Sequence, residues 1–175
     1  MEEEREASGP RQLDSDEQQQ WYAFAYVLTQ LPAALETRMQ RAAGIAHFDY
    51  VVMSALSMAP GRTLRMSELA QYAGSSLSRL SNVVIRLEKR DWVHRHPDPA
   101  DGRSTLATLT DEGMGKVVAA APVHVDAVRG LVFDPLTKAQ QRQLGAASRR
   151  ILGALDAPCP TDWAPSDAIS PADQD

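Results

Sequence analysis

The stretch Ser67–Leu109 decides the fold, and it reads SELAQYAGSSLSRLSNVVIRLEKRDWVHRHPDPADGRSTLATL. Its pattern predicts a short helix capped by Ser67, a turn at Gly74, and a second helix capped by Ser75 or Ser76. Two strand segments follow, and an Asp-Gly turn signal separates them. This order predicts a helix-turn-helix with a β-hairpin wing, an arrangement that places its second helix in the major groove of DNA.

The second helix carries two stripes of opposite chemistry. Apolar residues at helical spacing predict a face that packs against the domain: Leu77, Leu80, Val84 and Leu87. Polar residues form the candidate DNA-binding face: Ser75, Ser76, Ser78, Arg79, Asn82 and Arg86. Arginine donates two hydrogen bonds to guanine, asparagine pairs with adenine, and serines near a helix N-terminus suit phosphates. The alternative is an amphipathic helix whose polar face is only solvated.

The predicted wing has its own candidate contacts. Arg103 follows the turn, where a cation reaches the minor groove or its phosphates. Arg95 and His96 are further candidates for phosphate contact. Asp101 is interpreted as an orienting residue that pairs with Arg103. The alternative is an ordinary polar hairpin with a solvated arginine.

Helical patterns flank this region on both sides. Pro32 interrupts the first of them and predicts a kink or break, and Pro122 predicts a kink in the helix that follows the wing. Threonine caps begin the last two helices, and the second of these caps belongs to a Thr-x-x-Gln capping box. The expected spans are Asp14 or Ser15 to about Ala43 with Gly44 as terminator, His47–Met58, Thr110 to about Gly130, and Thr137 to near Leu155.

These patterns predict a mainly α chain with a small β-wing. Its expected parts are a disordered acidic N-terminus (1–15), a helical dimerisation and support region (16–60), the winged helix-turn-helix (61–109), C-terminal dimerisation helices (110–156) and a disordered acidic tail (157–175).

The acidic balance of the chain, formally −5, lies in its ends. Residues 1–20 contain seven acidic and two basic side chains, and residues 157–175 contain four acidic and no basic ones. The remaining residues have sixteen bases to twelve acids, so the positive charge that attracts a polyanion lies in the predicted folded part.

Several classes of protein are disfavoured. The acidic N-terminus is unlike a signal peptide, and no apolar run is long enough to span a membrane. Cys159 is the single cysteine, which fits a reducing, cytoplasmic setting. No phosphate-binding glycine loop or hydrolase motif is present, so no enzyme activity and no cofactor are expected. His94-x-His96 lacks a third ligand nearby and is interpreted as a surface pair, not a metal site.

The same residues resemble the MarR family of bacterial winged-helix regulators. The resemblance rests on Ser78-Arg79-Leu80, the helix end at 86–90, Trp92-Val93, and the Asp-Pro-Ala-Asp-Gly-Arg wing at 98–103 that leads to Leu109-Thr110. It extends more weakly over about residues 20–155. One departure is Asp91, where the family usually has glycine. We expect Asp91 to adopt the left-handed conformation at a small cost in stability.

The resemblance implies a homodimeric transcriptional regulator, a repressor in the usual case, that binds a pseudo-palindromic duplex. It also raises the prospect of release by a small aromatic or phenolic effector. Candidate pocket residues are Trp21, Tyr22, Tyr26, His47 and Asp49, although the aromatic ones fit a core or interface role as well. The alternative from another class is a winged-helix protein-interaction module without DNA affinity.

Overall fold

The computed structural model describes residues 11–155, which form two units, one ending at Ala34 and the other beginning at Leu35. The expectations for residues 1–10, for the tail from 156 onward and for Cys159 lie outside the described residues. The protein is mainly helical with one small antiparallel sheet, as the sequence predicted.

The first unit is formed by the N-terminal part of helix α1 (Ser15–Ala43). Asp14 and Glu17 begin the helix through reciprocal hydrogen bonds between side chain and backbone, of 2.8 and 3.0 Å. The assigned helix continues through Pro32, so the predicted break is absent. The large apolar side chains of this unit are mostly exposed: Trp21, Tyr22, Phe24, Tyr26, Val27 and Leu28.

The second unit contains the hydrophobic core. It begins with the last part of α1. This helix ends before Gly44, whose φ of +63° is the left-handed conformation. Then come α2 (His47–Met58), the 3₁₀ turn Pro60–Arg62 and the short strand β1 (Thr63–Arg65). Fully buried side chains from helices and the sheet of this unit meet in one cluster, which includes Met39, Met53, Leu56, Leu69, Leu80, Leu87, Val93 and Val117.

The helix-turn-helix consists of α3 (Met66–Tyr72) and α4 (Leu77–Glu88). Gly74 adopts the predicted left-handed conformation between them, with a φ of +56°. Ser76 accepts a hydrogen bond from the backbone N–H of Arg79 and is the cap of α4. Ser67 was predicted as the cap of α3, but it lies inside the helix, which begins at Met66. The capping position belongs to Arg65, whose backbone N–H donates to the Glu68 carboxylate at 3.3 Å.

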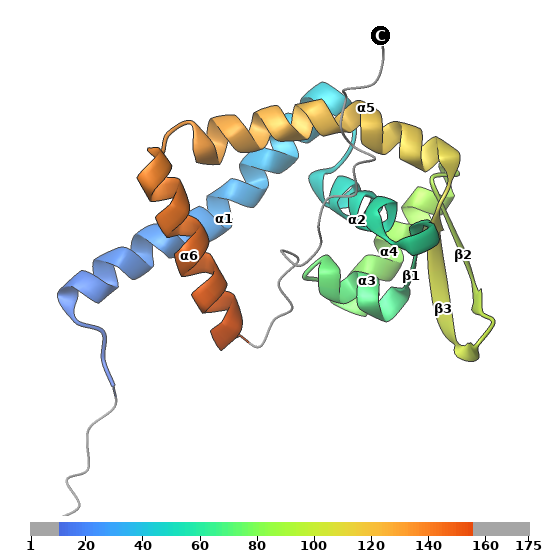
Figure 1. Ribbon diagram of the computed structural model, residues 1–175, viewed down its shortest axis with the longest axis horizontal. Helices are drawn as coiled ribbons and strands as arrows, with labels where there is room; N and C mark the ends of the chain where they lie inside the picture. Colours follow the sequence, from blue (N-terminus) through green and yellow to red (C-terminus); the bar gives the residue numbers. More distant parts are fainter. Residues whose placement is uncertain (1–10, 156–175) are drawn as a thin grey trace, which may run out of the picture. The chain divides into compact units, whose positions relative to one another are not determined.

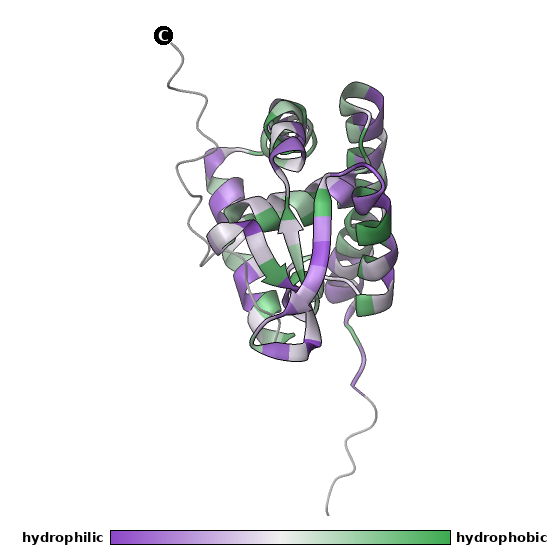
Figure 2. Ribbon diagram, turned by 90° about the vertical axis from the view of Figure 1, so that its right-hand side faces the viewer, coloured by the Kyte–Doolittle hydropathy of each residue, from purple (hydrophilic) through white to green (hydrophobic). Residues whose placement is uncertain are grey.

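The wing is the hairpin of β2 (Val93–Asp98) and β3 (Asp101–Leu109). The sheet order is β1-β3-β2, with both pairs antiparallel and a register shift between Pro97 and Asp98. Figure 1 shows α2, α3 and α4 beside the base of the sheet, with the hairpin projecting beyond them. After its buried first residue, β2 is largely hydrophilic (Figure 2).

Two further helices complete the second unit. Helix α5 (Asp111–Val128) is capped by Thr110, as predicted, and its assignment passes through Pro122 without a break. A π-helical turn (Arg129–Phe133) leads to α6 (Lys138–Ala154), which begins at the predicted Thr137 capping box. Within residues 11–155, no helix combines the length and apolar character needed to cross a membrane.

Candidate nucleic-acid interface

Helix α4 has one buried and one exposed face. Leu80, Val83, Val84 and Leu87 are buried, whereas the candidate DNA-binding residues Ser78, Arg79, Asn82 and Arg86 are exposed. Leu77 was expected in the buried stripe, but its residue is 52% exposed. Leu77 occupies the first helical position, where the helix has not yet reached the core. Val83 was not in the predicted apolar stripe, but it belongs to the buried face.

Arg79 lies against an aromatic ring of a different helix. Its guanidinium carbon lies 4.5 Å from the centroid of the Phe48 ring, which belongs to the first turn of α2. Within residues 11–155, no hydrogen bond or ion pair engages this guanidinium, so its N–H donors remain available to a ligand. This cation–π contact therefore restrains Arg79 without using its hydrogen-bonding capacity.

Arg86 forms an ion pair with a carboxylate from the core. Its Nη2 donates to Asp49 Oδ1 at 2.7 Å, and the Asp49 side chain is only 6% exposed. Burial raises the pKa of Asp49, while the neighbouring Arg86 and Arg90 partly oppose that increase. The Arg86 side chain is 54% exposed, so one edge of the guanidinium is anchored while much of the side chain is open to solvent.

Arg95 connects the wing to α4. Its guanidinium pairs with the Glu88 carboxylate at 2.6 Å, and its backbone N–H donates to the same side chain. These hydrogen bonds, above all those from the Arg95 side chain, lower the pKa of Glu88. The contact joins the first wing strand to the C-terminal end of α4.

The wing loop is held by its two aspartates. Asp98 is 7% exposed, pairs with Arg65 at 2.8 Å and accepts the Ala100 N–H at 2.9 Å. Asp101 accepts the backbone N–H of Arg103 and the hydroxyl of Ser104. Asp101 thus holds the backbone of Arg103, where the sequence suggested a pair with its guanidinium.

The remaining candidates differ in how they are engaged. No ion pair or hydrogen bond occupies the Arg103 guanidinium within the described part of the chain, and its residue is exposed. His96 contacts the Pro97 carbonyl at 3.2 Å and the Thr108 hydroxyl at 3.1 Å. The Ser75 hydroxyl donates to the Ser76 carbonyl at 3.2 Å. Arg103 is therefore the wing candidate that is readiest to meet an anion.

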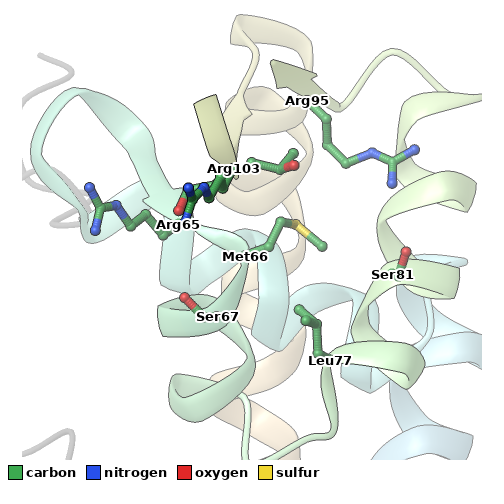
Figure 3. A pocket seen from close by; sticks show the side chains of 9 residues that line it. Arg65, Met66, Ser67, Leu77, Ser81, Arg95 and Arg103 are labelled. Atoms are coloured by element: carbon green, nitrogen blue, oxygen red, sulfur yellow. The ribbon is translucent and has the colours of Figure 1, made fainter. Parts of the chain in front are cut away.

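A hollow of about 300 Å³ lies between α4 and the wing. Figure 3 shows its lining converge from β1, α3, α4, β2 and β3, with Arg95 extending toward α4. The lining combines three arginines, four hydroxyl side chains and two apolar side chains: Arg65, Arg95, Arg103, Ser67, Ser81, Ser104, Thr105, Met66 and Leu77.

Arg65 and Ser81 were not among the predicted site residues. The strand β1 that ends at Arg65 has only three residues, too few for a strand periodicity to be visible in the sequence. Ser81 lies between Leu80 of the predicted apolar stripe and Asn82 of the predicted polar stripe, so neither stripe included it.

The residues predicted for an effector pocket belong to different units. Trp21, Tyr22 and Tyr26 are exposed in the first unit. In the second unit His47 stacks on His124 with ring centroids 5.5 Å apart, and Asp49 is already paired with Arg86. The effector pocket stays a prediction. Among residues 11–155, no group of three or more His, Cys, Asp or Glu side chains is arranged to hold a metal ion.

Comparison with known families finds a match over the winged region. Residues 46–104 match the sequence model of the MarR family. A crystal structure of Sco3205, a MarR family transcriptional regulator from Streptomyces coelicolor in complex with DNA, is similar to this chain with 44% sequence identity and a TM-score of 0.79. The similarity covers 85% of this chain and 92% of that one.

A second solved structure supports the same grouping, and a curated relative is a helix-turn-helix regulator. AbsC, a MarR family transcriptional regulator from Streptomyces coelicolor, is 33% identical with a TM-score of 0.77 over 84% of this chain and 99% of its own. The HTH-type transcriptional regulator YdcH from Bacillus subtilis is 32% identical over 81 residues. That alignment covers 45% of this chain and only 55% of YdcH.

Proposed function

This chain belongs to the MarR family of transcriptional regulators, and we propose that it binds a pseudo-palindromic DNA operator as a homodimer and acts as a repressor. The observation that carries the proposal is the exposed polar face of α4 beside a wing with a free arginine. A regulator of this kind works on chromosomal DNA, so we propose a cytoplasmic location.

The recognition helix supplies the base contacts in this proposal. Arg79 donates two hydrogen bonds to a guanine edge, and Asn82 pairs with adenine. Ser75, Ser76 and Ser78 lie at the N-terminus of α4, where hydroxyl groups and the positive end of the helix favour phosphates. The buried face of the same helix packs against the core, and this packing sets the direction in which these side chains extend.

The wing supplies contacts that do not depend on sequence. Arg103 lies next to the hairpin turn and enters the minor groove or pairs with its phosphates. Arg95 and His96 contact the phosphates of the DNA backbone, and the ion pair with Glu88 restrains Arg95. That Sco3205 was crystallised with DNA supports this assignment, because it is 44% identical to this chain.

The proposed dimer uses the helices outside the winged region. Exposed apolar side chains on the N-terminal part of α1 and on α6, such as Trp21, Leu28 and Ile151, suit burial against a second copy. Light scattering at micromolar concentration tests this: a dimer has twice the chain mass of 19.1 kDa. A folded monomer would contradict the proposal.

The function is tested by selecting duplexes from a random pool with the wild-type protein and measuring binding to the selected duplex. We expect Arg79→Ala to weaken this binding by about 1–3 kcal/mol and to relax the preference at one base position. Unchanged affinity of Arg79→Ala would overturn its base-reading role. Failure of the wild-type protein to enrich any duplex would overturn the function itself.

Release by a small aromatic acid is a further part of the proposal. It is tested by titrating salicylate into the complex with the selected duplex and following fluorescence anisotropy. Dissociation at constant ionic strength is the expected result. An unchanged signal for salicylate and a panel of other aromatic acids would contradict it.

A further inference from the structure

The first turn of α2 contacts both arginines of the recognition helix. We propose that Phe48 and Asp49 are positioning residues that hold Arg79 for base reading and Arg86 for phosphate contact. This inference rests on the proposed function, because it explains how the same face of α4 is kept ready for DNA.

Phe48 restrains Arg79 from one side only. A guanidinium that stacks on a ring uses its flat face, while its N–H groups lie in the plane and stay free. Base reading needs two of these donors in a fixed orientation toward guanine. An arginine that is already stacked loses less rotamer freedom on binding than one that is free in solvent. Phe48 therefore favours the specific complex without contacting DNA.

Asp49 restrains Arg86 by a different interaction. Its carboxylate is buried in the second unit, where burial raises its pKa, and the ion pair with Arg86 is 2.7 Å long. A buried ion pair contributes little net stability compared with apolar side chains of similar size. Its larger effect is geometric, because it holds one edge of the guanidinium and leaves the opposite edge for a phosphate oxygen.

The two contacts act on one face of α4. Arg79 and Arg86 are seven residues apart, so they lie about two turns apart on the same side of the helix. Phe48 and Asp49 are consecutive residues of α2. A single helical turn of α2 therefore restrains two arginines of the predicted contact face.

The test of Phe48 is a double-mutant cycle with Arg79 on the selected duplex. We expect Phe48→Leu to weaken specific binding about three- to tenfold, and Phe48→Tyr, which keeps the ring face, to bind as the wild type does. In an Arg79→Ala background, Phe48→Leu should cause no further loss. Additive losses would overturn the positioning role. Phe48→Met is a second variant without a ring that fills more of the ring's volume, should the leucine variant fail to fold.

The test of Asp49 separates positioning from stability. Asp49→Leu replaces a buried charge with an apolar side chain and leaves Arg86 half exposed, so the melting temperature should not fall. We expect the ratio of affinities for the selected and a scrambled duplex to fall about fivefold, because removing a negative charge also strengthens non-specific binding. A loss of both affinities in proportion to a loss of stability, or an unchanged ratio, would overturn the inference. Asp49→Asn, which retains an acceptor oxygen, should give an intermediate ratio.

The two proposals fail in different ways. If the wild-type protein enriches no duplex, the proposed function fails and the positioning role fails with it. If the wild type binds and the cycles are additive, DNA binding stands and only the role of the α2 turn is overturned.

Discussion

At the scale of single residues, Asp91 shows how the chain leaves the C-terminal end of α4. Its φ is +56°, the left-handed conformation expected at the position where the resemblance placed a glycine. The Asp91 carbonyl accepts the Thr110 hydroxyl at 2.6 Å, and the next N–H, of Trp92, returns to the Leu87 carbonyl at 3.1 Å. These contacts use the backbone of Asp91 and Trp92 and not the Asp91 side chain, so a glycine at position 91 would retain them.

Asp91→Gly is therefore expected to stabilise the protein. Removing Cβ relieves the left-handed strain, while the greater freedom of glycine in the unfolded chain offsets part of the gain. We expect the free energy of unfolding in urea to rise by about 0.5–1 kcal/mol. Asp91→Val is the contrasting variant, and its β-branched side chain should lower stability by more than 1 kcal/mol, about the cost of the conformation. A lower midpoint for the glycine variant would contradict this reading of Asp91.

Arg103 is expected to contribute through charge alone. Arg103→Ala should weaken binding to selected and scrambled duplexes alike and reduce the slope of log K against log salt by about one per subunit. The measurement is a salt titration of binding affinity. Arg142→Ala, which removes an exposed arginine from α6, is the matched control and should keep the slope. A loss confined to the selected duplex would point to base reading instead.

Local spacing predicted some residues and missed others for clear reasons. The caps Ser76, Thr110 and Thr137 involve partners three residues away, so their chemistry is visible in the sequence. The pair of Arg86 with Asp49 spans 37 residues and depends on how α2 crosses α4. Leu77 satisfied the helical period but lies beyond the edge of the core. Periodicity assigns a side of a helix, but not how far along its length the neighbouring elements cover it.

At the scale of elements, the junction of the wing with α5 is tightly packed. The Thr110 N–H donates to the Trp92 carbonyl at 3.1 Å, and the Thr110 side chain caps Gly113 at 2.9 Å. Gly113 is buried, and a Cβ there would overlap the Trp92 carbonyl oxygen and the Leu109 side chain. Two residues further along, Gly115 is exposed with open space around it.

This contrast predicts opposite effects of the same substitution on one helix. Gly113→Ala should destabilise the protein by about 1–3 kcal/mol or more, because rigid backbone blocks the added methyl group. Gly115→Ala should stabilise it by about 0.5–1 kcal/mol, since alanine is the better helix former. Urea denaturation of the two variants measures both effects. Equal effects would mean that α5 does not approach the wing strand as closely as the structure has it.

The elements differ in how far the sequence could predict them. Helices α2, α5 and α6 were predicted from caps, terminators and apolar period. The strand β1 was missed, because its three residues are strand-like only through pairing with Leu106–Thr108, more than forty positions away. The break that was one of the two outcomes predicted at Pro32 did not appear, and the assigned helix also continues through Pro122, where a kink was predicted. Proline removes one hydrogen bond, and a long helix with other contacts tolerates that loss.

At the scale of the whole molecule, the distribution of charge matters more for attraction to DNA than the net charge does. The formal charge of −5 conceals an excess of bases between residues 21 and 156. Charge alone does not identify the interface, because Arg65, Arg86 and Arg95 are each paired with a carboxylate. The fold brings these arginines together, so that several cations lie on the part of the surface formed by α4 and the wing.

The half-buried pair His47 and His124 predicts how stability depends on pH. Burial lowers the pKa of His47, an effect that Glu36 partly opposes, and burial together with His47 lowers the pKa of His124. Below the ordinary pKa of about 6.5, the unfolded chain therefore binds more protons than the folded protein. The free energy of unfolding should consequently fall as the pH decreases from 6.5 toward the lowered values of the pair.

Urea denaturation between pH 7.5 and 5.5, in about 0.1 M salt to screen surface charges, measures this fall. The double variant His47→Gln/His124→Gln should flatten the dependence in that window, because it removes both groups whose protonation the folded state disfavours. His94→Gln removes an exposed histidine from β2 and should keep the fall. A wild-type stability that rises toward pH 5.5, or a fall that persists in the double variant, would mean that groups other than the stacked pair set the pH response.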